Sequence, residues 1–358
     1  MSMQGWLSGS QSDAWLAQLE RIEWKDNEIL LLLAASASRA ALPAVWQWAR
    51  DKSVIVAGAL FPALIRGEQV AREGACWLRL TLAAPLLPLY PKHDEPSWRH
   101  DVQGTTAILL FNGQRDETEQ LLEGLYDYLG HSIRCIGAVG ESALQETGTA
   151  LFTQEGWCEA VGLAVFAACG LHSSRGYGFS SLPDMLIVTK AEKNRIVELN
   201  WQTAQTAYKG VLAAHGLVFD DVGRYPLGIV REESVDLVRS IVGMEEDGSL
   251  ICAGQVPENA VLSVLVAEGK AMAASVVAAA EEVEVAAAQG ALIVNCYARE
   301  QLEGPFFTKE LSALQQTLQR RNPNLGEIYG VLSYGEIVLP SDGILELCNK
   351  TVVIGVMV

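Results

Sequence analysis

The sequence predicts a mixed α/β protein whose sheets carry helices on their outer sides. Short apolar runs of strand length alternate with stretches of helical spacing, which is the pattern of strand–helix–strand units. The same order of elements recurs along the 358 residues, and each recurrence ends at a glycine-containing corner followed by glutamate. The chain is long enough for two domains with well-buried cores.

The first unit follows a short amphipathic start. An apolar run, a stretch with helical spacing and a second apolar run occupy residues 29–35, 40–50 and 54–58. Together they have the size of a βαβ unit. Gly58 and Gly67, followed by Glu68, mark its corner, and a turn at Glu73-Gly74 precedes another strand.

The second unit begins after a proline-rich loop at residues 85–99. A strand, an amphipathic helix and a strand are expected at residues 105–111, 116–129 and 133–137. Its corner runs from Gly137 to Glu141, with Gly140 directly before the glutamate. An edge strand over 149–152 completes it.

The third unit closes the chain. A buried strand, a helix, and a strand with its corner are expected at residues 291–297, 308–321 and 329–337. Between the second and third units, the sequence predicts a hairpin that turns at Lys193-Asn194 and a helix over 202–215 capped by Asn200. An alanine-rich helix is expected over 272–288.

The period of the three units is too irregular for a solenoid. Two related α/β halves joined near residue 200 are therefore the expected organisation. The predicted division is a lead-in over residues 1–26, a first domain over 27–200 and a second over 201–358.

Composition excludes several classes of function. A net charge of −17 without any basic run argues against a nucleic-acid partner, which requires clustered Lys and Arg. Three glutamates interrupt the longest apolar stretch, residues 271–288, so no membrane span is expected. The N-terminus lacks signal-peptide features, and the seven cysteines are scattered without a Cys-x-x-Cys pair. These observations predict a cytoplasmic protein with reduced thiols.

The sequence offers no motif for catalysis. It contains no Gly-x-Ser-x-Gly elbow, no Walker loop and no Gly-x-Gly-x-x-Gly after a strand. Acidic residues are abundant, but no pair stands out with a reason for shifted pKa values. A protein without enzymatic activity is the prediction.

Cys296 and Arg299 are the first candidates for a binding site. They stand at the end of a buried strand, where open α/β sheets bind ligands. Arg299 would bind a carboxylate or phosphate, with Cys296 lining the pocket. The alternative is a buried thiol beside an arginine that pairs with Glu300 or Glu303.

The third corner is the second candidate. Tyr334, Gly335 and Glu336 could supply a ring, backbone N–H groups and a carboxylate to a ligand that bears an amino group. Alternatively, Gly335 only permits the turn and Glu336 bonds neighbouring backbone, which the repetition of the corner favours.

The order of these features resembles the FIST family, a sensory module of FIST-N and FIST-C parts. The resemblance is carried by residues 132–141, 188–199, 244–248, 256–258 and, most specifically, 295–299 and 329–337. It implies signal transduction and small-ligand binding, and it places Gly140 and Glu141 in the expected ligand site. The first corner is stretched relative to the family, Glu141 replaces a more usual Asp, and Arg175-Gly176-Tyr177 replaces a His-Gly-Trp-like segment.

The resemblance also implies two particular roles. Some members bind haem and respond to nitric oxide through a separate histidine kinase, and a FIST portion recruits proteins in eukaryotic F-box proteins. A haem needs one axial histidine, for which His131, His172 and His215 are conceivable. His172 is the first choice because a Ser-Ser-Arg-Gly loop follows it beside apolar strands. Cys169 and His172 are at most half of a zinc site, so no metal site is predicted.

The leading hypothesis is a cytoplasmic sensory module that binds a small ligand between its two halves. Because the resemblance takes up the chain, the signal is expected to pass to a separate partner, such as a histidine kinase or another signalling protein. One alternative is a haem-binding nitric oxide sensor that acts on a histidine kinase. The other is a protein-recruiting scaffold without a small ligand.

Overall fold

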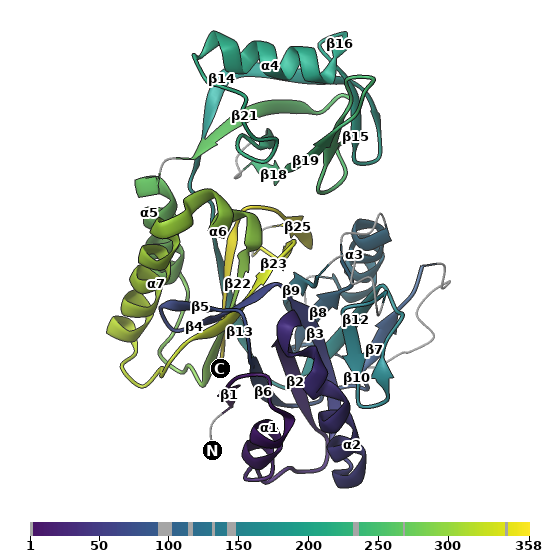
Figure 1. Cartoon of the computed structure of the whole chain (residues 1–358), viewed down its shortest axis with the longest axis vertical. Coiled ribbons are helices and arrows are strands. Elements are labelled where there is room, and N and C mark those ends of the chain that lie inside the picture. The colour runs from purple at the N-terminus through teal and green to yellow at the C-terminus, as the bar shows by residue number, and fades with distance from the viewer. Residues whose placement is uncertain are drawn as a thin grey trace.

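The computed structural model describes residues 3–91, 102–113, 117–130, 133–141, 148–231, 236–267, 269–340 and 343–358. It confirms a mixed α/β protein with helices outside its sheets (Figure 1). Three six-stranded sheets form the larger part, called the body here, and one further sheet forms a smaller part, residues 177–267, called the upper lobe. No helix among the described residues is long and apolar enough to span a membrane.

Each sheet of the body is built on one pair of parallel strands. The pairs are β2 (Glu28–Ala35) with β3 (Ile55–Phe61), β8 (Thr106–Phe111) with β9 (Arg134–Val139), and β22 (Gly290–Cys296) with β23 (Tyr329–Ser333). The helices that connect them are α2 (Leu42–Lys52), α3 (Glu117–Leu129), and α6 (Tyr297–Glu303) with α7 (Phe307–Arg321). The three predicted strand–helix–strand units are therefore confirmed.

After each parallel pair, a hairpin crosses into a different sheet. The hairpins are β4–β5 (Ala63–Arg66 and Gln69–Ala71), β10–β11 (Leu151–Thr153 and Gly156–Trp157) and β24–β25 (Glu336–Val338 and Glu346–Cys348). The first pairs with β23, the second with β3 and the third with β9. Each sheet thus takes its hairpin from another unit, and the exchange forms a closed cycle.

The remaining strands repeat the same arrangement three times. A strand after each hairpin returns to pair with the first strand of its own unit: β6 (Ala75–Thr81), β12 (Gly162–Ala167) and β26 (Val352–Met357). Each of these is flanked by an edge strand: β1 (Gln4–Leu7), β7 (Leu87–Leu89) and β13 (Leu171–Gly176). Strands from both sides of residue 200 consequently share the sheet β13-β26-β22-β23-β4-β5.

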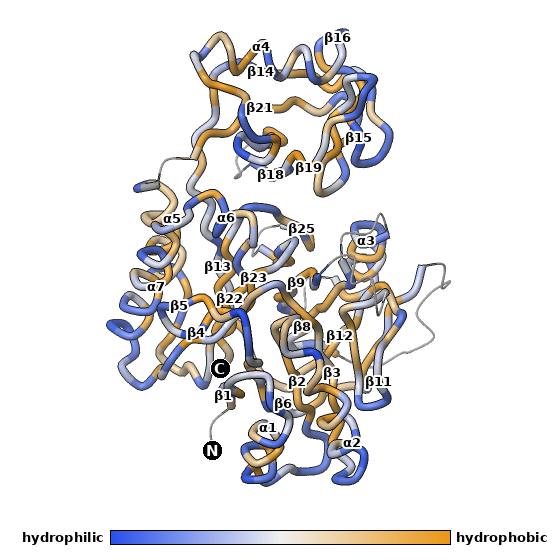
Figure 2. Tube along the Cα trace, viewed as in Figure 1, coloured by the Kyte–Doolittle hydropathy of each residue, from blue (hydrophilic) through white to orange (hydrophobic). Residues whose placement is uncertain are grey.

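The inner faces of the three sheets pack on a common core. Leu31, Ile108 and Val294, one from each sheet, belong to a single buried cluster. Separate clusters lie beneath the helices, with α1 (Ser12–Leu19) and α2 on one sheet, α3 on the second, and α5 (Gly269–Glu282) and α7 on the third. In Figure 2 the body strands are mostly orange, whereas the helices around them alternate in colour, as amphipathic helices do.

The second strand of every unit carries one glycine at the same place. A Cβ atom on Gly58, Gly137 or Gly330 would lie 2.1, 2.5 or 2.1 Å from a carbonyl oxygen of the neighbouring parallel strand. The predicted first corner is wrong in its position. Gly67, with φ of +56°, forms the turn of the β4–β5 hairpin, and the crossing between sheets falls at residues 61–63, which contain no glycine. Hairpin turns also favour glycine, which explains the error.

The upper lobe is a strongly curved sheet around its own core. Its strands are β14 (Phe179–Glu192), β15 (Arg195–Leu199), β16 (Gln202–Thr203), β17 (Leu227–Ile229), β18 (Leu237–Arg239), β19 (Ile241–Met244), β20 (Leu250–Cys252) and β21 (Val261–Ala267). The strands at the two ends of the sheet, β18 and β19, are separated in sequence by Ser240 alone, so the sheet curls back on itself. Helix α4 (Ala204–Ala214) packs on the apolar core of this lobe.

The predicted hairpin is confirmed as β14 and β15, and Lys193 in its turn has φ of 57°. The predicted helix cap is wrong. Asn200 has φ of 50°, and its side-chain oxygen accepts a hydrogen bond from the Ile187 amide at 2.8 Å. Thr203 is the residue at the N-cap instead. Asn200 tolerates the left-handed conformation that this tight turn needs, so its polarity serves the turn and not the helix.

Candidate functional site

The glycine-containing corners of the second and third units meet at the carboxyl ends of the parallel strands. The Tyr334 amide donates a hydrogen bond to the Val139 carbonyl at 3.1 Å, and the Val139 amide donates to Gly335 at 2.9 Å. The end of β3 joins them, because the Glu141 amide donates to the Leu60 carbonyl at 2.8 Å. The structure thus brings Gly140, Glu141, Tyr334 and Gly335 together, at the edge where α/β sheets bind ligands.

Side chains reinforce this meeting point. The Ser36 hydroxyl lies within hydrogen-bonding distance of the Glu141 carboxylate and of the Phe61 carbonyl. The Tyr334 ring packs edge-to-face on Tyr297 with centroids 5.6 Å apart. Burial, the Glu141 charge and Tyr297 raise the pKa of Tyr334 to about 12, so its phenol keeps its proton at neutral pH.

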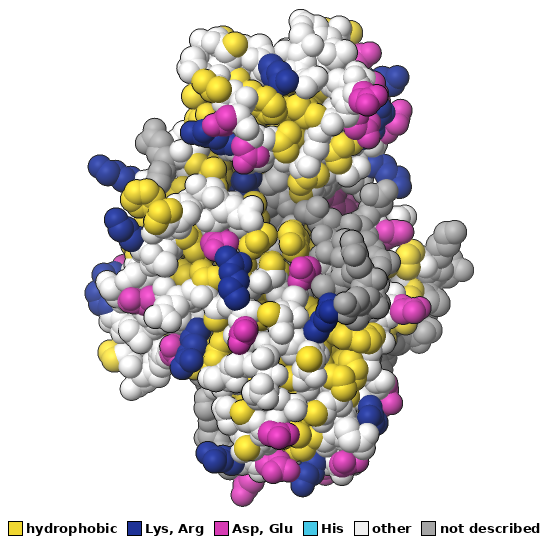
Figure 3. Space-filling model, in the orientation of Figure 1, with side chains coloured by type: hydrophobic (Ala, Val, Ile, Leu, Met, Phe, Trp, Pro, Cys, Tyr) yellow, Lys and Arg dark blue, Asp and Glu magenta, His cyan; other side chains and the backbone are white. Residues whose placement is uncertain are grey.

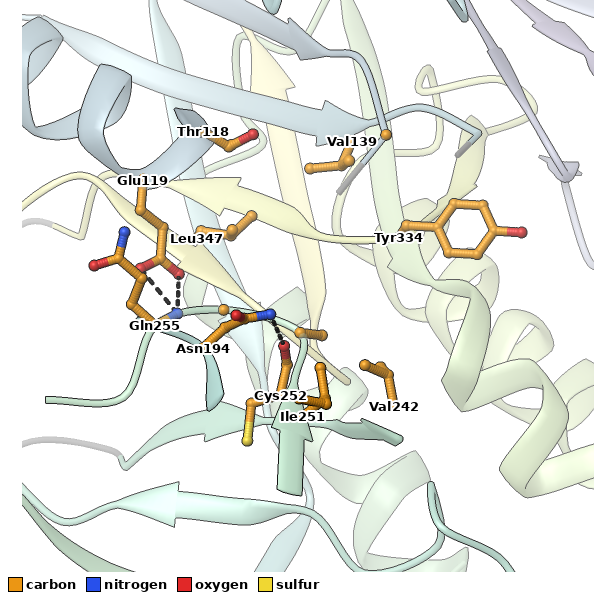
Figure 4. Close-up of a pocket in the computed structure, with 13 residues that line it drawn as sticks. Thr118, Glu119, Val139, Asn194, Val242, Ile251, Cys252, Gln255, Tyr334 and Leu347 are labelled. Atoms are coloured by element: carbon orange, nitrogen blue, oxygen red, sulfur yellow. Dashed lines mark hydrogen bonds between the residues drawn. The ribbon is translucent and has the colours of Figure 1, made fainter. Parts of the chain in front are cut away.

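A cleft of about 220 Å³ lies between the body and the upper lobe. The body supplies Gly113, Thr118, Glu119, Val139, Tyr334 and Leu347, and the lobe supplies Asn194, Val242 and residues 251–255. Figure 4 shows Tyr334 at one end of the cleft and Glu119 with Gln255 at the other. Of the predicted site residues, only Tyr334 lines this cleft.

The far end of the cleft is closed by contacts between body and lobe. The Glu119 carboxylate accepts hydrogen bonds from the Gln255 amide at 3.1 Å and from Arg239 at 3.0 Å. Burial raises the pKa of Glu119, and the Arg239 charge opposes that rise. Gly254 must be glycine here, because a Cβ atom would lie 2.6 Å from the Glu119 carboxylate.

One polar group on the cleft has an unmet hydrogen bond. The Thr118 hydroxyl is buried and has no partner among the described residues. Asn194 is held in place, because its amide nitrogen donates to the Cys252 carbonyl at 3.0 Å. A hydroxyl, an amide and a phenol thus stand among apolar side chains, which suits a small, partly apolar ligand.

No local sequence pattern points to the lobe side of the cleft. Val242 and Ile251 look like ordinary strand residues, and Gln255 stands in a loop without a motif. Only the pairing of distant segments shows that they face Tyr334. Thr118 and Glu119 were hidden for the same reason, as ordinary first-turn residues of a helix.

Glu336 and Cys296 lie beneath the corner and outside the cleft. Glu336 is fully buried and accepts hydrogen bonds from the Ser333 hydroxyl at 2.8 Å, the Thr351 hydroxyl at 2.9 Å and the Thr351 amide at 3.2 Å. Burial raises the pKa of Glu336 to about 7 and that of the neighbouring Cys296 thiol to about 12. In this structure Glu336 bonds neighbouring backbone and hydroxyl groups, as the alternative interpretation of the corner expected.

Arg299 is also fully buried and already engaged. Its guanidinium lies 2.6 Å from the Glu310 carboxylate and 3.7 Å from Glu303. It also donates to the carbonyls of Tyr177 at 2.9 Å and Lys350 at 3.2 Å. Arg299 was expected at the end of the strand but lies in the first turn of α6, directly after β22, and its main partner, Glu310, comes from helix α7.

Two carboxyls compete for this one guanidinium. Burial, followed by Glu310, raises the pKa of Glu303 to about 9, and the Arg299 charge lowers it. Glu310 lies closer to the guanidinium than Glu303 does, at 2.6 Å against 3.7 Å, so Glu310 is the main ion-pair partner of Arg299.

The predicted haem ligand lies on the surface. His172 is exposed on edge strand β13, opposite Val356, and it does not line the cleft. His215 pairs with Asp184 on the surface of the upper lobe, and His131 lies outside the described residues. An axial ligand needs an apolar crevice beside it, and neither the exposed His172 nor the surface ion pair of His215 is such a place. Among the described residues, no group of three or more His, Cys, Asp or Glu could hold a metal ion.

Comparison with known families decides the identity of the chain. The FIST N domain matches residues 23–202, and the FIST C domain matches residues 199–338. The chain belongs to the FIST family. FIST domains are generally taken as sensory domains in signal transduction. No curated protein matches the sequence.

The two matches of this FIST protein meet inside the upper lobe. Their boundary falls at the turn between β15 and β16, where Asn200 and Trp201 both have positive φ. Strands β14 and β15 come from the FIST N match, and β17 to β21 come from the FIST C match. The lobe side of the cleft therefore includes residues from both matches, with Asn194 from the first and Val242 from the second.

Proposed function

We propose that this FIST protein is a cytoplasmic sensory module that binds a small ligand in the cleft and passes its state to a separate partner. The observation that supports this is the composition of the cleft, whose walls come from the body and from the upper lobe. A ligand that touches both parts favours the arrangement in which they lie close together. Ligand binding thereby changes the position of the lobe.

The size and chemistry of the cleft restrict the ligand. A volume of about 220 Å³ lies below the range of about 300–1,000 Å³ that is usual for drug-sized ligands. Glu119 is already balanced by Arg239, so the cleft has little need of a charged ligand at that end. The expected ligand is a small molecule with an apolar part and one or two groups that reach the Thr118 hydroxyl and the Asn194 amide.

We propose binding without catalysis. The two buried carboxyls with the largest rises in pKa, Glu303 and Glu336, do not line the cleft. Both face partners within the chain, and Glu336 accepts three hydrogen bonds. Neither is placed to exchange a proton with a bound molecule.

A screen with a blocked cleft tests the binding site. A library of small metabolites is screened for compounds that raise the melting temperature of the wild-type protein. Val242→Trp fills the cleft from the lobe side and should abolish the rise, whereas Val218→Trp, at an exposed position of the same lobe, should leave it unchanged. A compound that stabilises both variants equally would exclude the cleft as its site.

Signalling to a partner is tested with the compounds that the screen identifies. The family resemblance favours a histidine kinase or another signalling protein as this partner. Its co-purification with the FIST protein should change when such a compound is added, and this change should disappear in Val242→Trp. If the amount of co-purified partner is changed neither by the compound nor by the substitution, the proposal is contradicted.

An exposed apolar area favours the scaffold as a second candidate. Met185 and Ile187 on β14, Val261 on β21 and the turn residue Trp201 are exposed, Trp201 by 77%. Ile187 pairs directly with Val261, and the amide of Asn200, next to Trp201, bonds the Ile187 carbonyl. Figure 3 shows hydrophobic side chains gathered on the face of the upper lobe. A partner that binds without any small molecule and is lost in Trp201→Ser would support this candidate.

The haem-based nitric oxide sensor stays a prediction with a direct test. Purified protein supplied with haem should show a Soret band that shifts with nitric oxide if the hypothesis holds. Protein that takes up no haem would exclude it. If a band forms and survives His172→Ala, another residue is the ligand.

A further inference from the structure

The chain enters and leaves the upper lobe at one place. It enters between the end of β13 at Gly176 and the start of β14 at Phe179, and it returns from Ala267 at the end of β21 to α5. Phe179 and Ala267 are paired in the sheet, so the two crossings lie side by side. The entering crossing packs directly on α5, since a Cβ atom on Gly178 would lie 2.7 Å from the Met272 Cα atom.

Arg299 contacts the entering crossing and the first turn of α5, the helix that follows the returning crossing. Its guanidinium donates to the Tyr177 carbonyl on the entering crossing and approaches the Met272 sulfur, in the first turn of α5, at 3.6 Å. The contact with Met272 is buried and the contact with Tyr177 is partly buried, and Glu310 accepts a hydrogen bond from the same guanidinium at 2.6 Å.

The same guanidinium also bonds residues 346–351, called the strap here, a segment that the upper lobe contacts as well. Arg299 donates to the Lys350 carbonyl at 3.2 Å. From the lobe, Arg231 pairs with Glu346, Arg239 donates to the Leu347 carbonyl at 3.0 Å, and the Ser240 amide donates to Asn349 at 3.4 Å. The strap also lines the cleft through Leu347.

Helix α6 connects this cluster to the cleft. The helix begins at Tyr297, whose ring packs on Tyr334 in the cleft wall, and Arg299 lies within its first turn. Leu302, near its end, packs against a small cluster in which Phe179 and Leu265 of the lobe meet Met272 of α5. One short helix therefore touches the cleft wall at one end and the crossings at the other.

We propose that Arg299 is the hinge clamp of the upper lobe. Its guanidinium ties the entering crossing, the first turn of α5 and the strap into one arrangement, and Glu310 keeps it oriented and charge-balanced. A ligand that displaces Tyr334 in the cleft also displaces Tyr297 and helix α6, and this changes the contacts of Arg299. The proposal explains how the cleft would control the lobe and in that respect rests on the proposed function, but the clamp itself is testable without a ligand.

The test measures the distance between lobe and body. Spin labels on unnatural amino acids at Val218 in the lobe and Lys52 in the body leave the native cysteines unchanged, and both sites are exposed. Glu310→Gln removes the counter-charge of Arg299 and should broaden the distance distribution measured by pulsed electron resonance. Glu300→Gln is the matched control, because Glu300 lies on the same helix but pairs with Arg72, so the narrow distribution should remain.

Several outcomes would overturn the clamp. A folded Glu310→Gln variant with the wild-type distribution would do so, and so would an equal broadening in both variants, since that would reflect general loosening of the core. If Glu310→Gln fails to fold, Arg299→Lys keeps the charge but cannot reach the entering crossing, α5 and the strap together. This variant should broaden the distribution, and an unchanged one would reject the proposal. The distance measurement uses no ligand, so its result stands even if the ligand screen identifies no compound. Val242→Trp changes the cleft and not the clamp, so the two tests can fail separately.

Discussion

Two opposing effects set the pKa of the Glu336 carboxyl group. Three hydrogen bonds from Ser333 and Thr351 favour the charged carboxylate, while complete burial favours the neutral acid. Burial is the larger effect, since the pKa rises from 4.5 to about 7. The folded protein therefore holds a proton here that the unfolded chain releases between these two values.

This proton predicts a pH dependence of stability. A raised pKa in the folded state means that the contribution of Glu336 is complete below pH 4.5 and is lost as the pH rises through about 7. Glu336→Gln cannot lose a proton, so its free energy of unfolding should fall less over this range, by up to about 3 kcal/mol. Urea denaturation at several pH values measures the difference. The exposed Glu281→Gln should retain the wild-type slope, and a wild-type slope in Glu336→Gln would contradict the prediction.

Gly330 makes a second prediction at the scale of a residue. A Cβ atom there would lie 2.1 Å from the Ile293 carbonyl oxygen, so Gly330→Ala must push two central strands apart. The expected loss in free energy of unfolding is about 1–3 kcal/mol or more. Gly326→Ala is the control, because no atom lies within 4 Å of its Cβ position. Thermal melting of both variants checks the difference, and equal melting temperatures would refute the packing argument.

At the scale of elements, the exchanged hairpins join the units physically. The hairpin β4–β5 is connected in sequence to β3, but its hydrogen bonds go to β23. Loosening it should therefore weaken two units at once.

Leu64→Ala tests this connection. Leu64 is fully buried in the common core, so its truncation should cost about 2–5 kcal/mol, whereas Val70→Ala, on the partly exposed second strand, should cost less. Most tryptophans lie in the first unit, so tryptophan fluorescence follows the unfolding of that unit, whereas far-ultraviolet circular dichroism follows all secondary structure. Both signals should show the same shift in the unfolding transition of the body. Separate transitions in the two signals for body residues would show that the hairpin does not couple the units.

How much of these elements the sequence could predict depends on the range of the interactions. Apolar runs such as residues 29–35 and the helical spacing over 308–321 are local patterns, and the strands and helices appear there. Pairing of β4 with β23 depends on residues far apart in the chain, for which one sequence carries no signal. Helix α6 was missed because it is only seven residues long and follows a strand directly.

The candidate site shows the same limit. The carboxyl ends of the strands were predicted, and Tyr334 does line a cleft there. Arg299 and Glu336 are titratable residues at the same edge, but their engagement inside the chain depends on Glu310 and Thr351, which other elements supply. Spacing along the chain does not distinguish a group that faces a cleft from one that faces a neighbouring helix.

At the scale of the whole molecule, the upper lobe is an insertion into the third unit. The body has the same six-strand order in all three sheets, and among the described residues a separate folded part stands between the edge strand and the next helix in the third unit alone. The lobe has its own core, distinct from the cores of the body. The body should therefore fold without the lobe.

Removal of the lobe is the corresponding prediction. Phe179 and Ala267 are direct partners across β14 and β21, so a two-residue Asn-Gly turn can join them. The shortened chain should be folded and melt cooperatively, with Glu119 and Glu346 now facing water. Circular dichroism and scanning calorimetry measure this. An unfolded or aggregated product would show that the body needs the lobe for its stability.

The cyclic exchange of hairpins also has a consequence during biosynthesis. A ribosome makes β4–β5 early, but the strand that completes its sheet, Tyr329–Ser333, is made almost at the end. Until then, Ala63, Leu64 and Ile65, all buried in the finished protein, remain uncovered. The nascent chain must therefore carry an open, apolar strand edge through most of its synthesis, a state that favours misassembly with other chains. Such a chain should depend on chaperones that shield its first unit until translation is complete.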